Sequence, residues 1–460
     1  MKLEKEIYRN GLWVIIDNIA LRSLAFATNL VLARILVPEA FGVFALVVVF
    51  TTVANNLIDF GLSTSLLRSQ KNDDTTYSTV FFVNVFISVL FSGLVFLISD
   101  LYESFQGVQG LGAIIRTYSI IFLIIGLSSV QRVVILRQLD YRKILFSKLP
   151  GSIGYPIMAI YMALNEYGVY SLVYGLLLSA VLETLMLWII SDWKPRFEFN
   201  LILLKQHLSF GTKMTISGLI YALITQLPKQ IAGKKYGLTS LGFYERYETL
   251  NLYSFSVINT FISKFITPLL GQNSADKRND LSIFTFIIFI TVPFYLLLSI
   301  NASSIIDVLL GTSWLQHVHV FRILNLVYLV KVITKYFSAK LVISGDSTIY
   351  LKFEFYKLVV VSFFLFIFYS LSFKLLVFAL LISEVCILVT YYFLMKSLNW
   401  IVSEYFKSLL VVLLCSLFSS LSFFLPYVVD SLFGDLLIKF IFFMLLYFLC
   451  FRIFRNYFYF

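Results

Sequence analysis

Several basic residues lie inside long apolar stretches of this chain, where a helix that faces lipid would carry no charge. Arginine can bind a phosphate group through two parallel hydrogen bonds, whereas lysine acts more as a point charge. These residue types therefore suit the binding of an anion, and we predict that they line a polar path through the protein. The five cations are Arg22, Lys229, Arg246, Arg322 and Lys331.

Four acidic residues accompany these cations, and each has a functional and a structural interpretation. They could balance the charge of an empty site or bind a coupling cation. Alternatively, they could pair with Arg22, fix a helix break just before Gly61, or compensate a helix dipole and pair with Lys234 or Lys235. The four are Asp17, Asp59, Glu245 and Glu248.

The elements that must position these residues are membrane-spanning helices. Hydrophobic residues make up 60% of the chain, charged residues only 13%, and the mean hydropathy is +0.90. No water-soluble core needs so much apolar sequence. A helix needs about 20 apolar residues to cross roughly 30 Å of hydrocarbon. We predict fourteen such helices, near 11–35, 40–66, 77–99, 110–135, 146–167, 168–190, 209–232, 240–270, 281–300, 315–343, 350–370, 373–395, 405–425 and 435–455.

The net charge of +11 reflects membrane orientation better than nucleic-acid binding. With the N-terminus placed in the cytoplasm, the inside loops and tails carry 19 Lys and Arg residues and the outside loops carry 3. This asymmetry follows the positive-inside rule. Both termini are therefore predicted to be cytoplasmic, in a multi-pass protein of the cell inner membrane, and no nucleic-acid partner is predicted.

The sequence offers no catalytic or metal centre. The three cysteines lie in separate apolar stretches without metal-ligand spacing, and the three histidines lie at loop edges without suitably spaced carboxylates. No phosphate-cradling G-x-x-x-x-G-K-[ST] loop is present, and the longest loop, near 191–208, is too short to fold as a domain. We therefore predict no cofactor, no metal and no enzymatic activity. Any transport must draw on an ion gradient, the substrate gradient or downstream consumption.

An internal echo at an offset of 200 residues indicates a duplication. Gly42 matches Gly242, Asp59 matches the near-isostere Asn259, and two further matches join Gly11 to Gly211 and Ser63 to Ser263. Repeats with an even number of helices share one orientation, which implies a pseudo-twofold axis along the membrane normal. We predict a six-helix lobe at 1–195, a second at 196–397 and two additional helices at 398–460.

Polar stripes at helical spacing run along the first two helices of each predicted lobe. In the first span the stripe is Asn18, Arg22, Ala25 and Asn29, and the positions 200 residues later are again small or polar. The stripes of all four helices would surround a shared cavity. Its predicted lining is Asn18, Arg22, Asn29, Asn56, Lys229, Arg246, Asn259, Arg322 and Lys331.

Three short motifs resemble a known family. They are the run ARILVPEAFGVF at Ala33–Phe44, the segment DFGL at Asp59–Leu62 followed by Arg68, and the segment RQLDYRK at Arg137–Lys143. The first 150 residues or so resemble the bacterial polysaccharide transporters, the Wzx-type flippases of the MATE-like (MOP) superfamily. Beyond them the resemblance is mainly architectural.

The resemblance implies a MATE-like fold, with two six-helix bundles around a V-shaped cavity and two extra C-terminal helices. It also implies transport of an undecaprenyl-diphosphate-linked oligosaccharide from the inner to the outer leaflet. Such a repeat unit serves the biosynthesis of lipopolysaccharide O-antigen, capsule or exopolysaccharide, and a polysaccharide polymerase and a chain-length regulator are implied partners.

Two other functions remain open at this point. A MATE-type cation-coupled multidrug exporter would favour a carboxylate-rich cavity, whereas the cavity residues here lean positive. A polysaccharide polymerase or ligase would carry a large external loop with Arg or His, whereas the predicted outside loops are short and poor in cations. Both alternatives therefore fit the residues less well than a flippase does.

Overall fold

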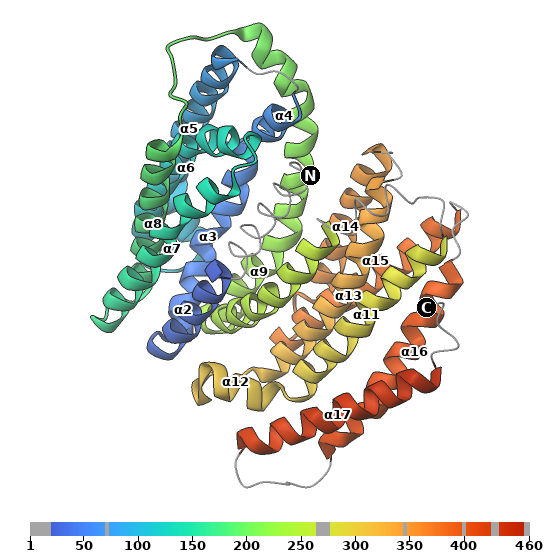
Figure 1. Cartoon of the computed structure of the whole chain (residues 1–460). Helices are drawn as coiled ribbons and strands as arrows, with labels where there is room; N and C mark the ends of the chain where they lie inside the picture. The colour runs from blue at the N-terminus through green and yellow to red at the C-terminus, as the bar shows by residue number, and fades with distance from the viewer. Residues whose placement is uncertain are drawn as a thin grey trace. The chain divides into compact units, whose positions relative to one another are not determined.

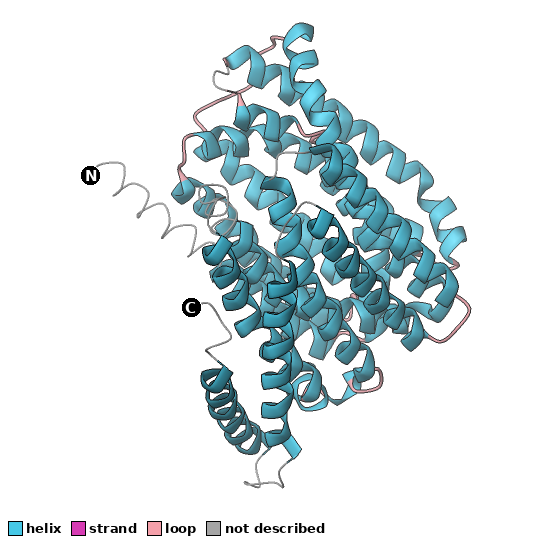
Figure 2. Ribbon diagram, turned by 90° about the vertical axis from the view of Figure 1, so that its right-hand side faces the viewer, coloured by secondary structure: helices cyan, strands magenta, loops and turns pink. Residues whose placement is uncertain are grey.

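The computed structural model describes residues 20–69, 73–263, 277–343, 347–397, 402–424 and 432–454. In these ranges the chain forms fifteen α-helices and two short 3-10 helices and contains no β-strand (Figure 2). Seven of the described helical segments are long and apolar enough to cross a membrane. The prediction of an all-α polytopic membrane fold is confirmed.

The chain divides into two compact units, Met1–Glu245 (unit 1) and Arg246–Phe460 (unit 2). In unit 1, α5 and α6 pack along each other, as do α7 and α8 (Figure 1). Its helices are α2 (Arg22–Ile35), α3 (Pro38–Leu57), α4 (Leu62–Arg68), α5 (Asp74–Gln106), α6 (Leu111–Arg137), α7 (Tyr141–Leu164), α8 (Val169–Ile190) and the larger part of α9 (Leu201–Phe261). The predicted lobe boundary at 195 and 196 stays a prediction.

Unit 2 contains the end of α9 and seven further helices. In it, α13 packs against α11 and α15, and α16 packs against α11 and α17. These helices are α11 (Lys277–Ile300), α12 (Ala302–Leu310), α13 (Val318–Ile343), α14 (Ser347–Phe368), α15 (Phe373–Ser397), α16 (Val402–Ser420) and α17 (Leu432–Phe454). Every predicted apolar stretch overlaps a helix, whereas α12 was not predicted because its nine residues are too few to span a membrane.

The backbone leaves helical geometry at two points, one between the seventh and eighth predicted spans and one inside the second. Gly237 has φ 84° and ψ 169°, a conformation that favours glycine, and it divides α9 where the seventh predicted span gives way to the eighth. A second break parts α3 from α4, where Phe60 has φ 44°. There the Asp59 carboxylate accepts hydrogen bonds from the Ser63 backbone N–H at 3.1 Å and from the Ser63 hydroxyl. Asp59 therefore stabilises the start of α4.

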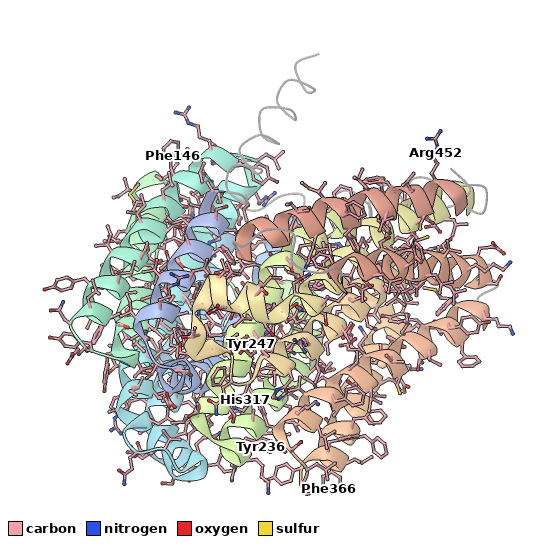
Figure 3. All side chains as sticks on the ribbon, turned by 90° about the horizontal axis from the view of Figure 1, so that it is seen from below. Phe146, Tyr236, Tyr247, His317, Phe366 and Arg452 are labelled. Atoms are coloured by element: carbon pink, nitrogen blue, oxygen red, sulfur yellow. The ribbon has the colours of Figure 1, made fainter. Side chains whose placement is uncertain are left out.

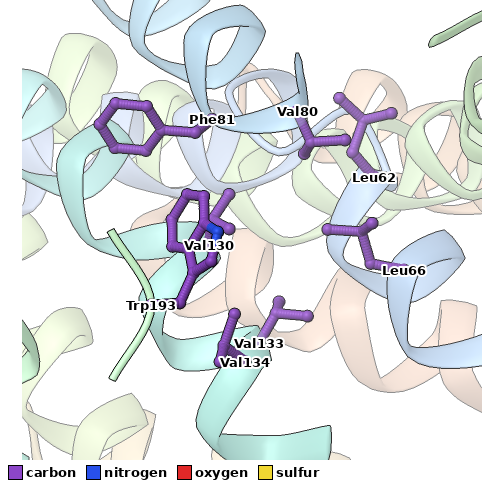
Figure 4. Close-up of a cluster of buried hydrophobic side chains, with 8 residues drawn as sticks. All are labelled: Leu62, Leu66, Val80, Phe81, Val130, Val133, Val134 and Trp193. Carbon is purple, nitrogen blue, oxygen red and sulfur yellow. The ribbon is translucent and has the colours of Figure 1, made fainter. Parts of the chain in front are cut away.

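The loop that joins α8 to α9 is fixed to unit 1 by an apolar and a polar contact. Trp193, which is 8% exposed, packs against Phe81 and Val130 in a buried cluster (Figure 4). The backbone N–H of Arg196 donates to Ser78 Oγ at 3.0 Å, and that of Asn200 donates to Thr79 Oγ1 at 3.0 Å. This loop, residues 191–200, is called the strap below.

The strap meets α5 at the first turn of that helix. Thr75 Oγ1 donates to Glu198 Oε2 at 2.5 Å, and Arg196 pairs with Asp74 at 3.0 Å. Asp73 caps the helix by accepting from the backbone N–H of Thr76 at 2.8 Å. The side-chain and backbone hydrogen bonds from Thr76 hold the pKa of Asp73 below its usual range, so this cap stays ionised at neutral pH.

The outer faces of the helices are apolar, as expected for contact with lipid. Phe86 and Leu97 on α5 are 63% and 78% exposed, and Phe366 on α14 is 82% exposed. Figure 3 labels Phe366 together with Tyr247, which is instead fully buried in unit 2. In a bilayer these exposed side chains face hydrocarbon, so their exposure carries no penalty.

Candidate functional site

Two predicted site residues form an ion pair across the break in α9. Lys229 lies before Gly237 and Glu245 after it, and their Nζ and Oε2 atoms are 2.7 Å apart. The two side chains are only 11% and 15% exposed. Lys229 is therefore an ion-pair partner of Glu245 in this structure. The role of Glu245 in balancing the charge of an empty site stays a prediction.

The predicted polar stripe of α3 faces the stripe of α9. Asn56 Oδ1 lies so close to the Gly218 backbone that a Cβ atom at position 218 would clash with it. Asn56 Nδ2 donates to the Thr52 carbonyl oxygen at 2.8 Å, and Gln226 Nε2 donates to Thr52 Oγ1 at 3.0 Å. Two of the four stripes expected to surround a common site are thus brought together within unit 1.

The start of α3 meets the restart of α9 in a reciprocal contact. A Cβ atom at Gly42 would clash with the Leu238 carbonyl oxygen, and one at Gly242 would clash with the Pro38 carbonyl oxygen. The partners 42 with 238 and 38 with 242 are related by the offset of 200. Between them the Thr239 hydroxyl donates to the Glu39 carboxylate. A reciprocal contact of this kind is what a twofold relation between the two segments would produce, and the duplication itself stays a prediction.

The end of α5 adds polar contacts beside this reciprocal contact. Tyr102 OH and Gln106 Nε2 donate to the side-chain oxygen of Gln230 at 2.5 and 2.6 Å. Lys234 Nζ lies 3.5 Å from the centre of the Phe105 ring. These α5 residues were not predicted. The hydropathy of this segment is ordinary, and no local sequence pattern indicates which α5 residues would contact α9.

The predicted site residues of α2 are only partly described. Arg22 is the first residue of α2 and is half-buried. Asn29 is also half-buried, and its Nδ2 donates to the Ala25 carbonyl oxygen at 2.9 Å. Asp17 and Asn18 lie outside the described residues. The predicted pairing of Asp17 with Arg22 therefore stays a prediction.

The remaining predicted residues belong to unit 2, where they lie on α9 and α13. Arg246 and Glu248 are buried, with 4% and 6% exposure. Asn259 is half-buried and accepts a long hydrogen bond of 3.5 Å from Ser263. Lys331 Nζ lies 4.8 Å from the centre of the Tyr328 ring. Arg322 is exposed and donates to Ser303 Oγ at 3.1 Å.

A polar cluster that was not predicted joins three helices of unit 2. The Asp280 carboxylate on α11 accepts from Tyr336 OH on α13 at 2.5 Å and from Tyr405 OH on α16 at 2.8 Å. Lys340 on α13 pairs with the same carboxylate and donates to Tyr405 OH at 3.0 Å. The cluster ties α16 to the helices before it. Hydropathy could not reveal it, because its other members lie 56 to 125 residues from Asp280 in the sequence.

Within the described ranges, no group of three or more His, Cys, Asp or Glu residues is arranged to hold a metal ion. The cysteines Cys386, Cys415 and Cys450 are not in disulfides. The chemistry available at the described site is therefore that of buried charges, amides and hydroxyls on apolar helices. Such groups can bind and pass a polar solute.

Solved structures with the same fold define the class of protein. The chain superposes on the lipid II flippase MurJ in an inward closed conformation with a TM-score of 0.77, covering 97% of this chain and 99% of that chain at 15% identity. An inward-facing multidrug resistance MATE transporter of the MOP superfamily gives a TM-score of 0.64, covering 84% and 96% at 16% identity. The fold is thus that of a MOP-type membrane transporter. Residues 31–319 match the family described as polysaccharide biosynthesis protein, and the chain belongs to this family.

Curated relatives come from several polysaccharide systems. The chain is 22% identical to the lipopolysaccharide biosynthesis protein WzxC of Escherichia coli, over 78% of this chain and 74% of that protein. It is 25% identical to the succinoglycan biosynthesis transport protein ExoT of Rhizobium meliloti, over 60% of this chain and only 56% of that protein. The family resemblance and the prediction of a transporter instead of an enzyme are confirmed.

Proposed function

We propose that this protein is a flippase that moves an undecaprenyl-diphosphate-linked oligosaccharide from the cytoplasmic to the periplasmic leaflet. The observation that carries the proposal is membership of the polysaccharide biosynthesis family together with the fold of a lipid II flippase. The names of the relatives WzxC and ExoT support the same substrate class.

The chemistry of this cargo matches the residues of the chain. A lipid-linked diphosphate sugar carries two anionic charges and a hydroxyl-rich head, neither of which can enter hydrocarbon, whereas its tail can stay there. The transporter must supply cations and hydrogen-bonding groups within its spans. Lys229 and Arg246 on α9 are buried cations of this kind, and Asn56 on α3 and Gln226 on α9 supply amide groups.

The proposed setting is the inner membrane, with both termini in the cytoplasm. Alternating access would expose a cationic central cavity to one side and then the other. A polysaccharide polymerase and a chain-length regulator would act on the delivered repeat unit. The product would be O-antigen, capsule or exopolysaccharide.

Arg22 gives the sharpest test of the proposed substrate contact. We expect Arg22→Ala to lower flux about 10- to 100-fold at constant protein level, because a hydrogen bond to a charged group contributes about 1.5–3 kcal/mol. Arg22→Lys should also be impaired, since lysine keeps the charge but loses the paired donors of the guanidinium group. Flux is measured as surface polysaccharide restored to a strain that lacks its own transporter.

The level of membrane-inserted protein serves as the control, since loss of a helix anchor lowers folded protein whereas loss of a substrate contact does not. Full restoration by Arg22→Ala at a normal level would remove Arg22 from the site and point to Arg322 and Lys331. Failure of the wild-type chain to restore polysaccharide in any such strain, combined with increased drug resistance, would instead favour the exporter function.

A further inference from the structure

Two glutamine side chains of unit 1 meet at the end of α5 and leave two polar atoms unpaired. Gln106 is the last residue of α5 and is 7% exposed, and its Nε2 donates to Gln230 Oε1 on α9 at 2.6 Å. Among the described residues, Gln106 Oε1 and Gln230 Nε2 have no hydrogen-bond partner, although both atoms are buried. A buried amide atom without a partner is costly, so this place normally holds a ligand or water.

The two unpaired atoms define the chemistry of the ligand. Gln230 Nε2 is a donor and Gln106 Oε1 is an acceptor, and both are neutral. A fully ionised phosphate has no proton to give to an amide oxygen, and a metal cation cannot accept from an amide N–H. A hydroxyl group both donates and accepts, so it suits the two atoms together. The ligand is therefore rich in hydroxyl groups, or it is water.

Aromatic rings beside the amides favour a sugar over water alone. Tyr102 OH donates to the same Gln230 Oε1 at 2.5 Å, and the ring of Tyr102 lies 6.5 Å from that of Phe105. Lys234 Nζ lies over one face of the Phe105 ring, and Phe105 is still 55% exposed. An accessible ring next to neutral donors and acceptors can pack against the C–H groups of a sugar while the amides bind its hydroxyl groups.

This place lies where the polar head of the cargo would leave the protein. Gly107, with φ 72°, ends α5 directly after Gln106, and the loop that follows is predicted to face the periplasm. Gln230 lies seven residues, or about two turns, before the break of α9 at Gly237. The hydrogen bond between Gln106 and Gln230 joins the two helices here. When the helices part, its donor and acceptor become available as well.

We propose that Tyr102, Gln106 and Gln230 form a saccharide-binding subsite at the periplasmic end of unit 1, with Phe105 as its stacking surface. Sugar hydroxyl groups pair with the unused amide atoms and, as α5 and α9 part, replace the bonds that Tyr102 and Gln106 make to Gln230. The role of the subsite in transport rests on the proposed flippase function. Sugar binding itself does not, and the experiment separates the two claims.

The binding test measures the thermal unfolding midpoint of the purified full-length protein. The probes are lipid-free head oligosaccharides, released by mild acid from the lipid-linked repeat units of several polysaccharide-producing strains, and inorganic pyrophosphate in parallel. We expect at least one oligosaccharide to raise the midpoint in a saturable way. Gln106→Met and Gln230→Met should each weaken its apparent affinity about 2- to 10-fold, the effect of losing one hydrogen bond. Their response to pyrophosphate should match that of the wild type.

Gln131 on α6 provides a matched control. It is 0% exposed, and both polar atoms of its side chain also lack a hydrogen-bond partner among the described residues. Gln131→Met should keep the full oligosaccharide response. Tyr102→Phe removes only a hydroxyl group and takes the place of a glutamine variant that does not fold. A midpoint that no oligosaccharide shifts, or subsite variants that respond like the wild type, would overturn the subsite and assign the unpaired atoms to ordered water.

Polysaccharide restoration then tests the role in transport. In strains that lack their own transporter, Gln106→Met should lower flux at constant protein level, and most strongly where the head oligosaccharide of the strain stabilises the wild type most. Equal losses in strains with different head sugars would mean that Gln106 only holds this end closed, and would reject the sugar contact in transport. Failure of the wild type to restore polysaccharide, with oligosaccharide stabilisation intact, would count against the flippase alone.

Discussion

At the scale of single residues, the ion pair of Lys229 and Glu245 combines a high desolvation cost with a short, well-defined contact. Both charges are largely removed from solvent, and their separation of 2.7 Å compensates the desolvation that burial imposes. The pair also bridges the two parts of α9 on either side of Gly237. Its loss should therefore be felt as a loss of folded protein and not only as a loss of activity.

We expect Glu245→Gln to destabilise the protein by about 3–5 kcal/mol, since it leaves the Lys229 charge buried without its carboxylate. The double variant Lys229→Met with Glu245→Gln should recover most of this loss. Thermal inactivation of the purified protein measures both effects. The exposed pair of Lys407 and Glu404, 2.8 Å apart, is the control, and Glu404→Gln should cost only about 0–1 kcal/mol. Equal effects at the two pairs would contradict the buried character of the first.

At the scale of elements, α3 and α9 are held together where the chain is predicted to face the periplasm. Three sets of contacts lie there. They are the reciprocal glycine contacts, the hydrogen bond from Thr239 to Glu39, and the hydrogen bond from the Tyr102 hydroxyl to the Gln230 side-chain oxygen. The alternating access proposed above would require that this end open during each cycle. Polar contacts suit such an end because water can replace each hydrogen bond when the helices part.

A disulfide across this contact should stop transport. In a Glu39→Cys, Thr239→Cys variant we expect oxidation to abolish flux and a reductant to restore it. The matched control is Thr75→Cys with Glu198→Cys, which replaces a second threonine–glutamate hydrogen bond, one that joins the strap to α5. That disulfide should leave flux largely intact, since Trp193 already packs the strap against α5 and α6. Normal flux with a fully formed 39–239 disulfide would show that these ends need not separate.

At the scale of the whole molecule, orientation in the membrane is the property that the charge pattern predicts most directly. The loop between α5 and α6 should face the periplasm. A cysteine at Gln109, which is exposed, suits labelling better than one at Glu103, whose carboxylate accepts backbone N–H groups of Gly110 and Gly112.

We expect Gln109→Cys to react with a membrane-impermeant maleimide in intact cells. Phe197→Cys, in the fully exposed part of the strap, should react only after permeabilisation. The asymmetry of Lys and Arg between the two sides is the physical reason. The opposite pattern of labelling would invert the topology and the direction of the proposed transport.

The sequence predicted the elements of this fold better than the contacts between them. A stretch of 20 apolar residues is enough to predict a helix, and every predicted stretch overlaps one. Asn56 of the predicted α3 stripe lies against Gly218 of the predicted α9 stripe, whereas the cavity that the stripes would surround stays a prediction. Which side chains meet depends on the rotation and vertical offset of each helix. Hence the pairing of Glu245 with Lys229 was not predicted, and the Asp280 cluster was missed.

The reciprocal contact of α3 with α9 has the geometry of an isologous interface, the kind found in twofold homodimers. In a homodimer, both sides of the axis must carry the same residue, so a glutamate there would meet a glutamate and a threonine would meet a threonine. A single chain in which two different segments form such a contact is free of that restriction. Position 39 is Glu while its counterpart at position 239 is Thr, and the hydrogen bond between them is one that two identical subunits could not make across their axis.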